Sequence, residues 1–138
     1  MNTRWMSVVA AVVLGAGWLS AQQSISTKIV ANVPFGFVAG GASLPAGEYV
    51  VGEVNSTVLM VTNKASTNKA LVFTVGKAQT QGEAAAKLVF RRYGDTYFLA
   101  EVWRGEKSGS LIPKTRQEKD VALIAANKGE LVTVAGIR

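Results

Sequence analysis

The chain has no cysteine among its 138 residues, and this absence excludes three kinds of chemistry. No disulfide can support the fold, and no thiolate can act as a nucleophile or a metal ligand. Attachment of a lipid through a cysteine behind a leader sequence is excluded as well. A protein of this composition depends on the packing of its core for stability.

Histidine is also absent, which removes histidine-based triads, most zinc sites and the commonest general base. The carboxylates do not replace it. Glu101 and Asp95 lie too far apart along one predicted hairpin for the paired acids of a glycosidase, and Glu48 and Glu53 fall on opposite faces of a strand. We therefore expect a protein that is not an enzyme, with no catalytic residues, no metal and no cofactor.

Long apolar runs are confined to the start of the chain. Arg4 precedes an apolar segment from Ser7 to Leu19, and the small residue Ala21 follows it, as in a secretory signal peptide. A membrane anchor is the second interpretation, because a membrane span needs roughly 20 apolar residues. We expect a signal peptide at residues 1–21 and a single β domain at residues 22–138, which contains 138 − 21 = 117 residues. The mature protein is then exported, to the periplasm or the extracellular medium.

Acidic residues are the minority charge, with 9 Asp and Glu against 15 Lys and Arg, so the net charge is +6. This balance permits contact with anionic polymers, although the scattered positions of the charges also fit a general role in solubility. The expected partners are envelope polysaccharide or another protein. Nucleic acid is not expected, and membrane contact is expected only through an uncleaved signal peptide.

The stretch from Lys87 to Arg104 is predicted to be a β-hairpin around which the domain is organised. Gly94-Asp95 separates two runs rich in β-branched and aromatic residues, and glycine supplies the positive φ that such a turn needs. Pairing Tyr93 with Thr96 sets the register and divides the side chains between two faces. One face carries Leu88, Phe90, Arg92, Tyr97, Leu99, Glu101 and Trp103. The other carries Val89, Arg91, Tyr93, Thr96, Phe98, Ala100 and Val102.

The rest of the mature chain alternates between short apolar strands and turns. Apolar residues alternate strictly from Ile29 to Phe37, and Pro34 within this run predicts an edge strand or a bulge. Further strands are expected at 48–54, 57–62, 70–75 and 130–135, and a mobile loop at 76–86. Thr115 and Glu118 have capping-box spacing, which predicts a helix from Arg116 to about Ala125 that buries Val121, Ile124 and Ala125.

This spacing of strands and turns predicts an all-β fold, either an antiparallel β-sandwich or a partly open barrel. One short C-terminal helix would cover one end, and the signal peptide helix would precede the domain.

Five segments together resemble a group of small secreted β-rich proteins of environmental Gram-negative bacteria. The segments are 32–37 (NVPFGF), 44–50 (LPAGEYV), 87–94 (KLVFRRYG), 97–103 (YFLAEVW) and 113–118 (PKTRQE). The resemblance covers nearly all of the mature chain and implies export and an all-β domain. It carries over no catalytic or binding residue.

One group of side chains has the composition of a binding surface. Arginine and aromatic side chains together can stack on sugars or bases and hold anions. The candidates are Arg91, Arg92, Tyr93, Tyr97, Trp103 and Arg104. The competing interpretation is that Tyr97 and Trp103 belong to the core and that the arginines are charges at strand ends.

Three functions stay open at this point. The first is an exported non-catalytic β-domain that acts as an envelope or extracellular interaction or structural protein. The second is a carbohydrate-binding or anionic-polymer-binding module that uses the Arg/aromatic strip. The third is a self-assembling surface subunit in which the apolar strand at Ile29–Phe37 adds to the sheet of a neighbour.

Overall fold

The computed structural model describes residues 28–81, 85–105, 107–126 and 129–138. The predicted signal peptide at residues 1–21 lies outside the described residues. The domain expected at residues 22–138 is therefore described from Lys28 onward.

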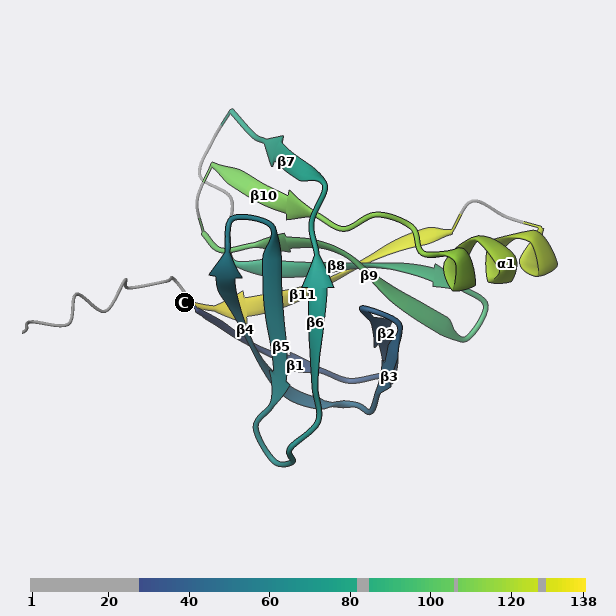
Figure 1. Ribbon diagram of the computed structural model, residues 1–138, viewed down its shortest axis with the longest axis horizontal. Coiled ribbons are helices and arrows are strands. Elements are labelled where there is room, and N and C mark those ends of the chain that lie inside the picture. The colour runs from purple at the N-terminus through teal and green to yellow at the C-terminus, as the bar shows by residue number, and fades with distance from the viewer. Residues whose placement is uncertain (1–27, 82–84, 106, 127–128) are drawn as a thin grey trace, which may run out of the picture.

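The described residues form short strands and one helix, α1 (Figure 1). In chain order the elements are β1 (Ile29–Val33), β2 (Phe37–Ala39), β3 (Ala42–Leu44), β4 (Gly47–Asn55), β5 (Val58–Asn63), β6 (Lys69–Phe73), β7 (Gly76–Gln79), β8 (Lys87–Tyr93), β9 (Thr96–Trp103), β10 (Ser108–Leu111), α1 (Arg116–Ala125) and β11 (Glu130–Ile137). The all-β prediction with one C-terminal helix is confirmed. The strands expected at 48–54, 57–62, 70–75 and 130–135 correspond to β4, β5, β6 and β11, whereas part of the expected loop at 76–86 forms β7.

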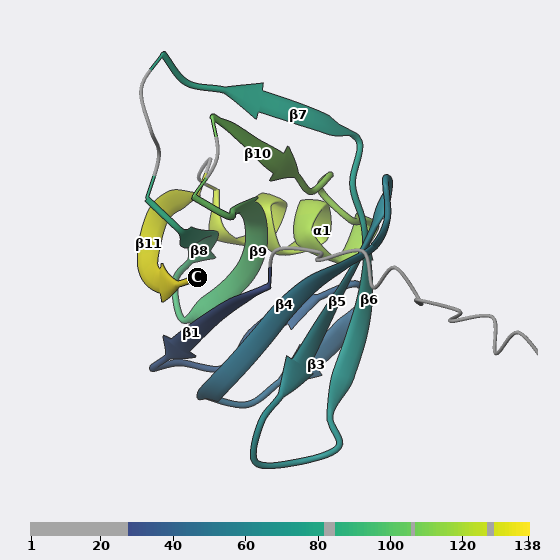
Figure 2. The same cartoon turned by 90° about the vertical axis from the view of Figure 1, so that its left-hand side faces the viewer.

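The strands join into one curved sheet with the order β3-β2-β9-β8-β11-β1-β4-β5-β6. All neighbours on this path are antiparallel except β2 and β9, which are parallel at Val38 and Phe98. A side branch adds β10 to β9 and β7 to β10. The halves β1-β4-β5-β6 and β11-β8-β9 curve toward each other, which gives a nearly closed barrel (Figure 2).

The main core fills the inside of this barrel. Every second residue of the strands points inward, because successive side chains of a strand alternate between its faces. The largest fully buried side chains include Tyr49, Phe90, Ile29, Leu59 and Leu88, which come from both halves of the sheet. Phe37 contacts both Tyr49 and Phe90, with ring centroids 5.0 Å and 5.1 Å apart. The aromatic contacts therefore join the two halves.

The barrel closes where the turn between β2 and β3 meets β6. Gly40, in this turn, lies so close to β6 that a Cβ atom on it would overlap the carbonyl oxygen of Leu71. Its φ of +58° is also in the left-handed region that favours glycine. Because β6 and β2 are not ladder neighbours, this glycine contact forms the seam of the barrel.

The prediction of an edge strand at Ile29–Phe37 is wrong. β1 pairs with β4 over its whole length and with β11 at Val30 and Ala31. Pro34 lies between β1 and β2, so it interrupts no ladder. The ends of the sheet are β3 and β6, and β7 ends the side branch.

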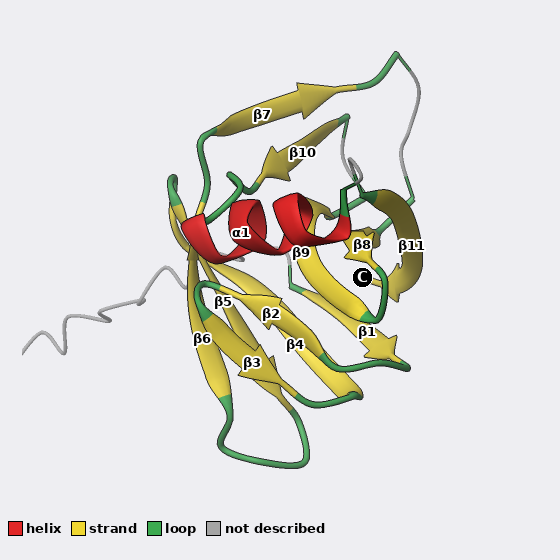
Figure 3. Ribbon diagram, turned by 90° about the vertical axis from the view of Figure 1, so that its right-hand side faces the viewer, coloured by secondary structure: helices red, strands yellow, loops and turns green. Residues whose placement is uncertain are grey.

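The helix packs on the outside of the barrel and forms a second, smaller core. Val38, Tyr93 and Phe98 are buried there beneath the helix residues Val121, Ala122 and Ala125. Figure 3 views the molecule from the side on which α1 lies. The predicted helix bounds are confirmed, but the prediction that Ile124 is buried is wrong, because Ile124 is 87% exposed.

Candidate functional site

A β-bulge in the central hairpin changes the faces predicted for the Arg/aromatic residues. Tyr93 pairs with Thr96 as expected, but the register shifts between Phe90, which pairs with Leu99, and Val89, which pairs with Glu101. Ala100 is therefore the extra residue of the bulge. Its carbonyl oxygen accepts a hydrogen bond from the Ile112 amide at 2.9 Å.

The bulge exchanges the faces of the last residues of β9. Val102 now pairs with Leu88 and joins the barrel core. Trp103 pairs with Lys87, and Glu101 with Val89, so both move to the face opposite the one predicted. The six candidate residues are thus divided among three places.

Arg91 and Tyr93 lie beneath the helix and contact the buried carboxylate of Glu118. The Arg91 Nε–H donates to both oxygens of Glu118, at 3.1 and 2.9 Å, and Arg91 Nη2 donates to the Ile112 carbonyl at 3.3 Å. The Tyr93 hydroxyl donates to Glu118 Oε2 at 3.4 Å. This buried cluster joins the helix to the sheet.

Burial raises the pKa of the Tyr93 hydroxyl above its usual value, and the nearby negative charge of Glu118 raises it further. The phenol consequently stays protonated and acts as a hydrogen-bond donor to the carboxylate. Its role in the cluster is therefore structural.

Arg92 and Tyr97 lie on the opposite face of the hairpin, where they extend a stack of aromatic rings. The Tyr97 ring stacks on Phe35 with centroids 3.8 Å apart, and the Arg92 guanidinium lies 5.7 Å from the Tyr97 centroid. Arg92 Nε–H also donates to the Gly94 carbonyl at 2.6 Å. The Tyr97 ring is thus in contact with Phe35 and has the Arg92 guanidinium nearby. Across the sheet, Arg92 is paired with Glu130 of β11.

Trp103 and Arg104 lie at the other end of the hairpin, and both are less than a tenth exposed. The Trp103 ring covers Gly109, where a Cβ atom would come within 2.5 Å of the indole, and the Lys87 ammonium lies 5.5 Å from the ring centroid. Trp103 Nε1–H donates to Glu101 at 3.3 Å. Arg104 forms an ion pair with Glu53 of β4.

These positions do not combine the six residues into one exposed surface. Tyr93, Trp103 and Arg104 are buried, and Arg91, Arg92 and Tyr97 are half-buried on two different faces. Ligand binding by these six residues stays a prediction.

The structure instead shows an apolar surface on the outside of β1, β4, β5 and β6, which we name the apolar outer face. Its side chains point away from the barrel core and are partly or largely exposed. They are Val30, Val50, Val54, Val58, Met60, Leu71 and Phe73. The exposed fractions reach 51% for Leu71, 53% for Val54 and 67% for Phe73.

The strand register places these side chains side by side. Val30 pairs with Val50, Met60 with Leu71, and Val58 with Phe73. Paired residues of neighbouring strands project from the same face, so the apolar outer face extends from β1 to β6. Between β4 and β5 it is interrupted, because Val50 pairs with Thr62 and Met60 pairs with Gly52. Sequence reasoning did not identify it, although β5 and β6 carry apolar residues at both odd and even positions.

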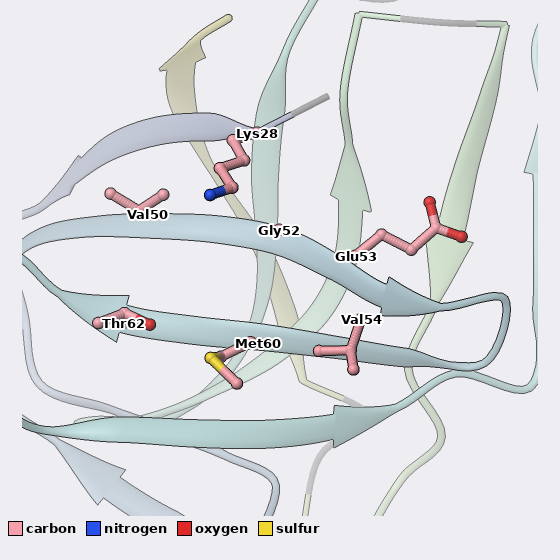
Figure 4. A pocket seen from close by; sticks show the side chains of 7 residues that line it. All are labelled: Lys28, Val50, Gly52, Glu53, Val54, Met60 and Thr62. Atoms are coloured by element: carbon pink, nitrogen blue, oxygen red, sulfur yellow. The ribbon is translucent and has the colours of Figure 1, made fainter. Parts of the chain in front are cut away.

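The apolar outer face has a hollow at its centre (Figure 4). The cavity has a volume of about 280 Å³ and is lined by Lys28, Val50, Gly52, Glu53, Val54, Met60 and Thr62. Gly52 supplies no side chain, and Met60 is its direct partner on the adjacent strand. A hollow and an adaptable apolar side chain therefore lie next to each other.

A second cavity, of about 270 Å³, lies at the seam of the barrel. Its lining includes Gly40 and Gly41 of the turn, Val72 and Phe73 of β6, and Ile112, with Pro113 and Thr115 completing it.

The described residues contain no membrane-spanning helix and no cluster of possible metal ligands. In the part of the chain that the structure describes, no helix has the length and apolar character needed to cross a bilayer. Among the same residues, no three histidine, cysteine, aspartate or glutamate side chains are grouped so that they could hold a metal ion.

Comparisons with known proteins do not identify a family for this chain. No protein-family model, curated protein or solved structure matches this chain.

Proposed function

We propose that this chain is an exported, non-catalytic interaction domain that associates with a second copy of itself through the apolar outer face. The observation that carries the proposal is the exposure of apolar side chains on the same face of β1, β4, β5 and β6. Exposed apolar patches of this kind mark interaction surfaces in proteins that are otherwise covered by polar residues. Export is supported by the leader pattern at residues 1–21.

The association uses the face of the sheet and not its edges. The Gly40 turn is pressed against the Leu71 carbonyl, so a strand from a neighbour has no room beside the middle of β6. The other two ends of the sheet are protected in the way typical of natural edge strands. β3 has three residues, and β7 carries the exposed Lys77.

A second copy fits this face because most of its exposed side chains are apolar. Glu48 and Lys69 lie at its margin, whereas the Lys28 side chain lies against Gly52 and lines the central hollow together with Glu53, which carries a charge of opposite sign. Met60 lies one strand spacing, about 4.8 Å, from the hollow at Gly52. A two-fold axis near Met60 places the Met60 and Leu71 side chains of the two copies against each other.

The size of the face predicts a weak dimer. Four strands span roughly 15–20 Å in width, so two such faces packed about 10 Å apart bury an area at the lower end of the range for specific interfaces. We expect the dimer to form in the micromolar concentration range, where local concentration in the envelope controls assembly.

The test is sedimentation velocity over a concentration series. The mature protein should shift from monomer to dimer, and Leu71→Glu combined with Phe73→Glu should weaken the dimer by at least tenfold, because two carboxylates would be buried unpaired. Leu123→Glu is the matched control, since Leu123 is also exposed but lies on α1. A wild-type protein that stays monomeric at millimolar concentration, or an equal effect of the control, would contradict the proposal.

Binding of an anionic polymer to the Arg/aromatic residues is the second proposal. Arg92 and Tyr97 are its best-placed members, because they are half-exposed and stacked. Glu130 lies beside Arg92 across the sheet and Asp95 lies in the adjacent turn, so the local charge opposes an anion there. This charge is why we rank self-association first.

A further inference from the structure

The most exposed large apolar side chains of the described residues lie on α1. Leu123 is 80% exposed and Ile124 is 87% exposed. The helix lies at one end of the long axis of the molecule, away from the apolar outer face (Figure 1). Two large apolar side chains thus project from one tip of the protein.

The helix cannot turn to bury them, because its other side is fixed to the sheet. Glu118 holds Arg91 beneath the helix, and Ala122 and Ala125 pack on the small core at Tyr93 and Phe98. Residues four apart lie on the same side of a helix. The side that faces the sheet is therefore defined by two such pairs, Glu118 with Ala122 and Val121 with Ala125. Leu123 and Ile124 fall on the opposite side by necessity.

Positive charges lie toward the start of the helix, before the exposed pair, and its last turn has none. Lys114 precedes the helix, and Arg116 and Lys119 lie on its exposed side together with one acidic residue, Asp120. Three cations and one anion give a local net charge of 3 − 1 = +2. Glu118 does not offset this charge, since it is buried and paired with Arg91. In the described part of the chain, the three cations form no ion pair with a carboxylate.

We propose that the tip formed by Lys114, Arg116, Lys119, Leu123 and Ile124 docks on the surface of an anionic lipid bilayer. Two apolar side chains that project from a protein are buried only by a partner that deforms around them. The interface between lipid headgroups and acyl chains deforms in this way. The cations on the first turns of the helix then approach lipid phosphates, which adds electrostatic attraction. The inference is independent of self-association, because it uses a different surface.

Flotation of the purified mature protein with lipid vesicles tests this proposal. The protein should float with vesicles of phosphatidylglycerol and phosphatidylcholine in equal parts and not with phosphatidylcholine alone. Leu123→Glu with Ile124→Glu should reduce the bound fraction at least fivefold. Leu71→Glu with Phe73→Glu should leave flotation unchanged while it weakens the dimer, so the two proposals fail separately.

Three results would overturn the inference. They are the absence of flotation with either vesicle, equal flotation with both, and flotation that is unchanged in the Leu123→Glu, Ile124→Glu variant. If that variant instead abolishes dimerisation, the tip is a protein interface and not a lipid-binding one.

A fluorescent label gives a second measurement that does not depend on variant folding. The chain has no cysteine, so Ile124→Cys can carry a single environment-sensitive dye. Its emission should shift to the blue on anionic vesicles, whereas the same dye at Val75→Cys, another exposed apolar position, should not respond. Equal responses at the two positions would contradict docking through the tip.

Discussion

Glu118 is the buried acidic residue whose surroundings best explain how α1 is attached. Its carboxylate has almost no contact with water and receives donors from Arg91 and Tyr93. A charge in such a place is stable only while its partner is present, because the cost of removing it from water is large. The attachment of the helix therefore depends on this pair.

Glu118→Ala should lower the free energy of unfolding by about 3 kcal/mol, since it leaves the Arg91 guanidinium largely buried and unpaired. Urea denaturation followed by fluorescence measures the loss. The matched control is Glu48→Ala, which removes the exposed pair with Lys64 and should cost less than about 1 kcal/mol. Similar losses in the two variants would show that the buried pair contributes little.

At this scale the sequence predicts local geometry but not distant partners. The Thr115 hydroxyl accepts from the Glu118 amide at 3.2 Å, as the capping-box spacing predicts. The Glu118 carboxylate, however, contacts Arg91, 27 residues away in the chain. Local spacing cannot show which cation another element will bring, and this contact decides which side of the helix is buried.

The turn between β2 and β3 has two glycines with positive φ, but they have different surroundings. Gly40 faces the Leu71 carbonyl, whereas a Cβ atom on Gly41 would meet nothing within 4 Å. The two residues share the same backbone requirement and differ in the space available. They allow the contact at the barrel seam to be measured separately from backbone strain.

Gly41→Ala should destabilise the protein by about 1 kcal/mol, the cost of placing a side chain in the left-handed region. Gly40→Ala should cost at least about 2 kcal/mol more, because the turn must also move away from β6. Thermal and urea denaturation of the two variants measure the difference. Equal destabilisation would mean that the turn adjusts freely and that the seam contact is weak.

Elements whose signals are local were predicted well. Gly94-Asp95 gives the hairpin turn and the Tyr93–Thr96 pair, because turn geometry depends on the residues in the turn. The bulge at Ala100 was missed, since it accompanies hydrogen bonding to Ile112 from a later segment. The alternation of Ile29 to Phe37 indicates which side chains are buried, but it cannot identify the strands on either side.

The main core of the molecule is continuous across the curved sheet. It contains residues from β1 to β6, from β8 and β9 and from the segment after β10, and no boundary divides it among the described residues. Removal of residues 1–21 would leave Trp103 as the single tryptophan, because the other two are Trp5 and Trp18. Trp103 then reports on the sheet at the β9–β10 pair.

The mature protein should unfold in a single cooperative transition. In urea, Trp103 fluorescence and far-ultraviolet circular dichroism should give the same midpoint, since side-chain packing and strands are lost together. The measurement is made at low micromolar concentration, where the monomer dominates. Two separate transitions would show that the domain at residues 22–138 consists of two folding units.

The fold class follows from strand spacing, whereas the surfaces do not. Short apolar strands at regular intervals predict an all-β barrel or sandwich because each strand must bury at least one face. β5 and β6 are apolar on both faces, and periodicity alone cannot show whether the second face is covered by protein or by another molecule. The three-dimensional arrangement was needed to locate the apolar outer face.

The position of β11 has a consequence for biogenesis. This strand lies between β8 and β1, so it joins the two halves of the sheet, and its residues Gly136 and Ile137 pair with Ala31 and Val30 of β1. A polypeptide that is still emerging from the ribosome lacks this connection. Assembly of the complete sheet therefore waits until β11 has been synthesised.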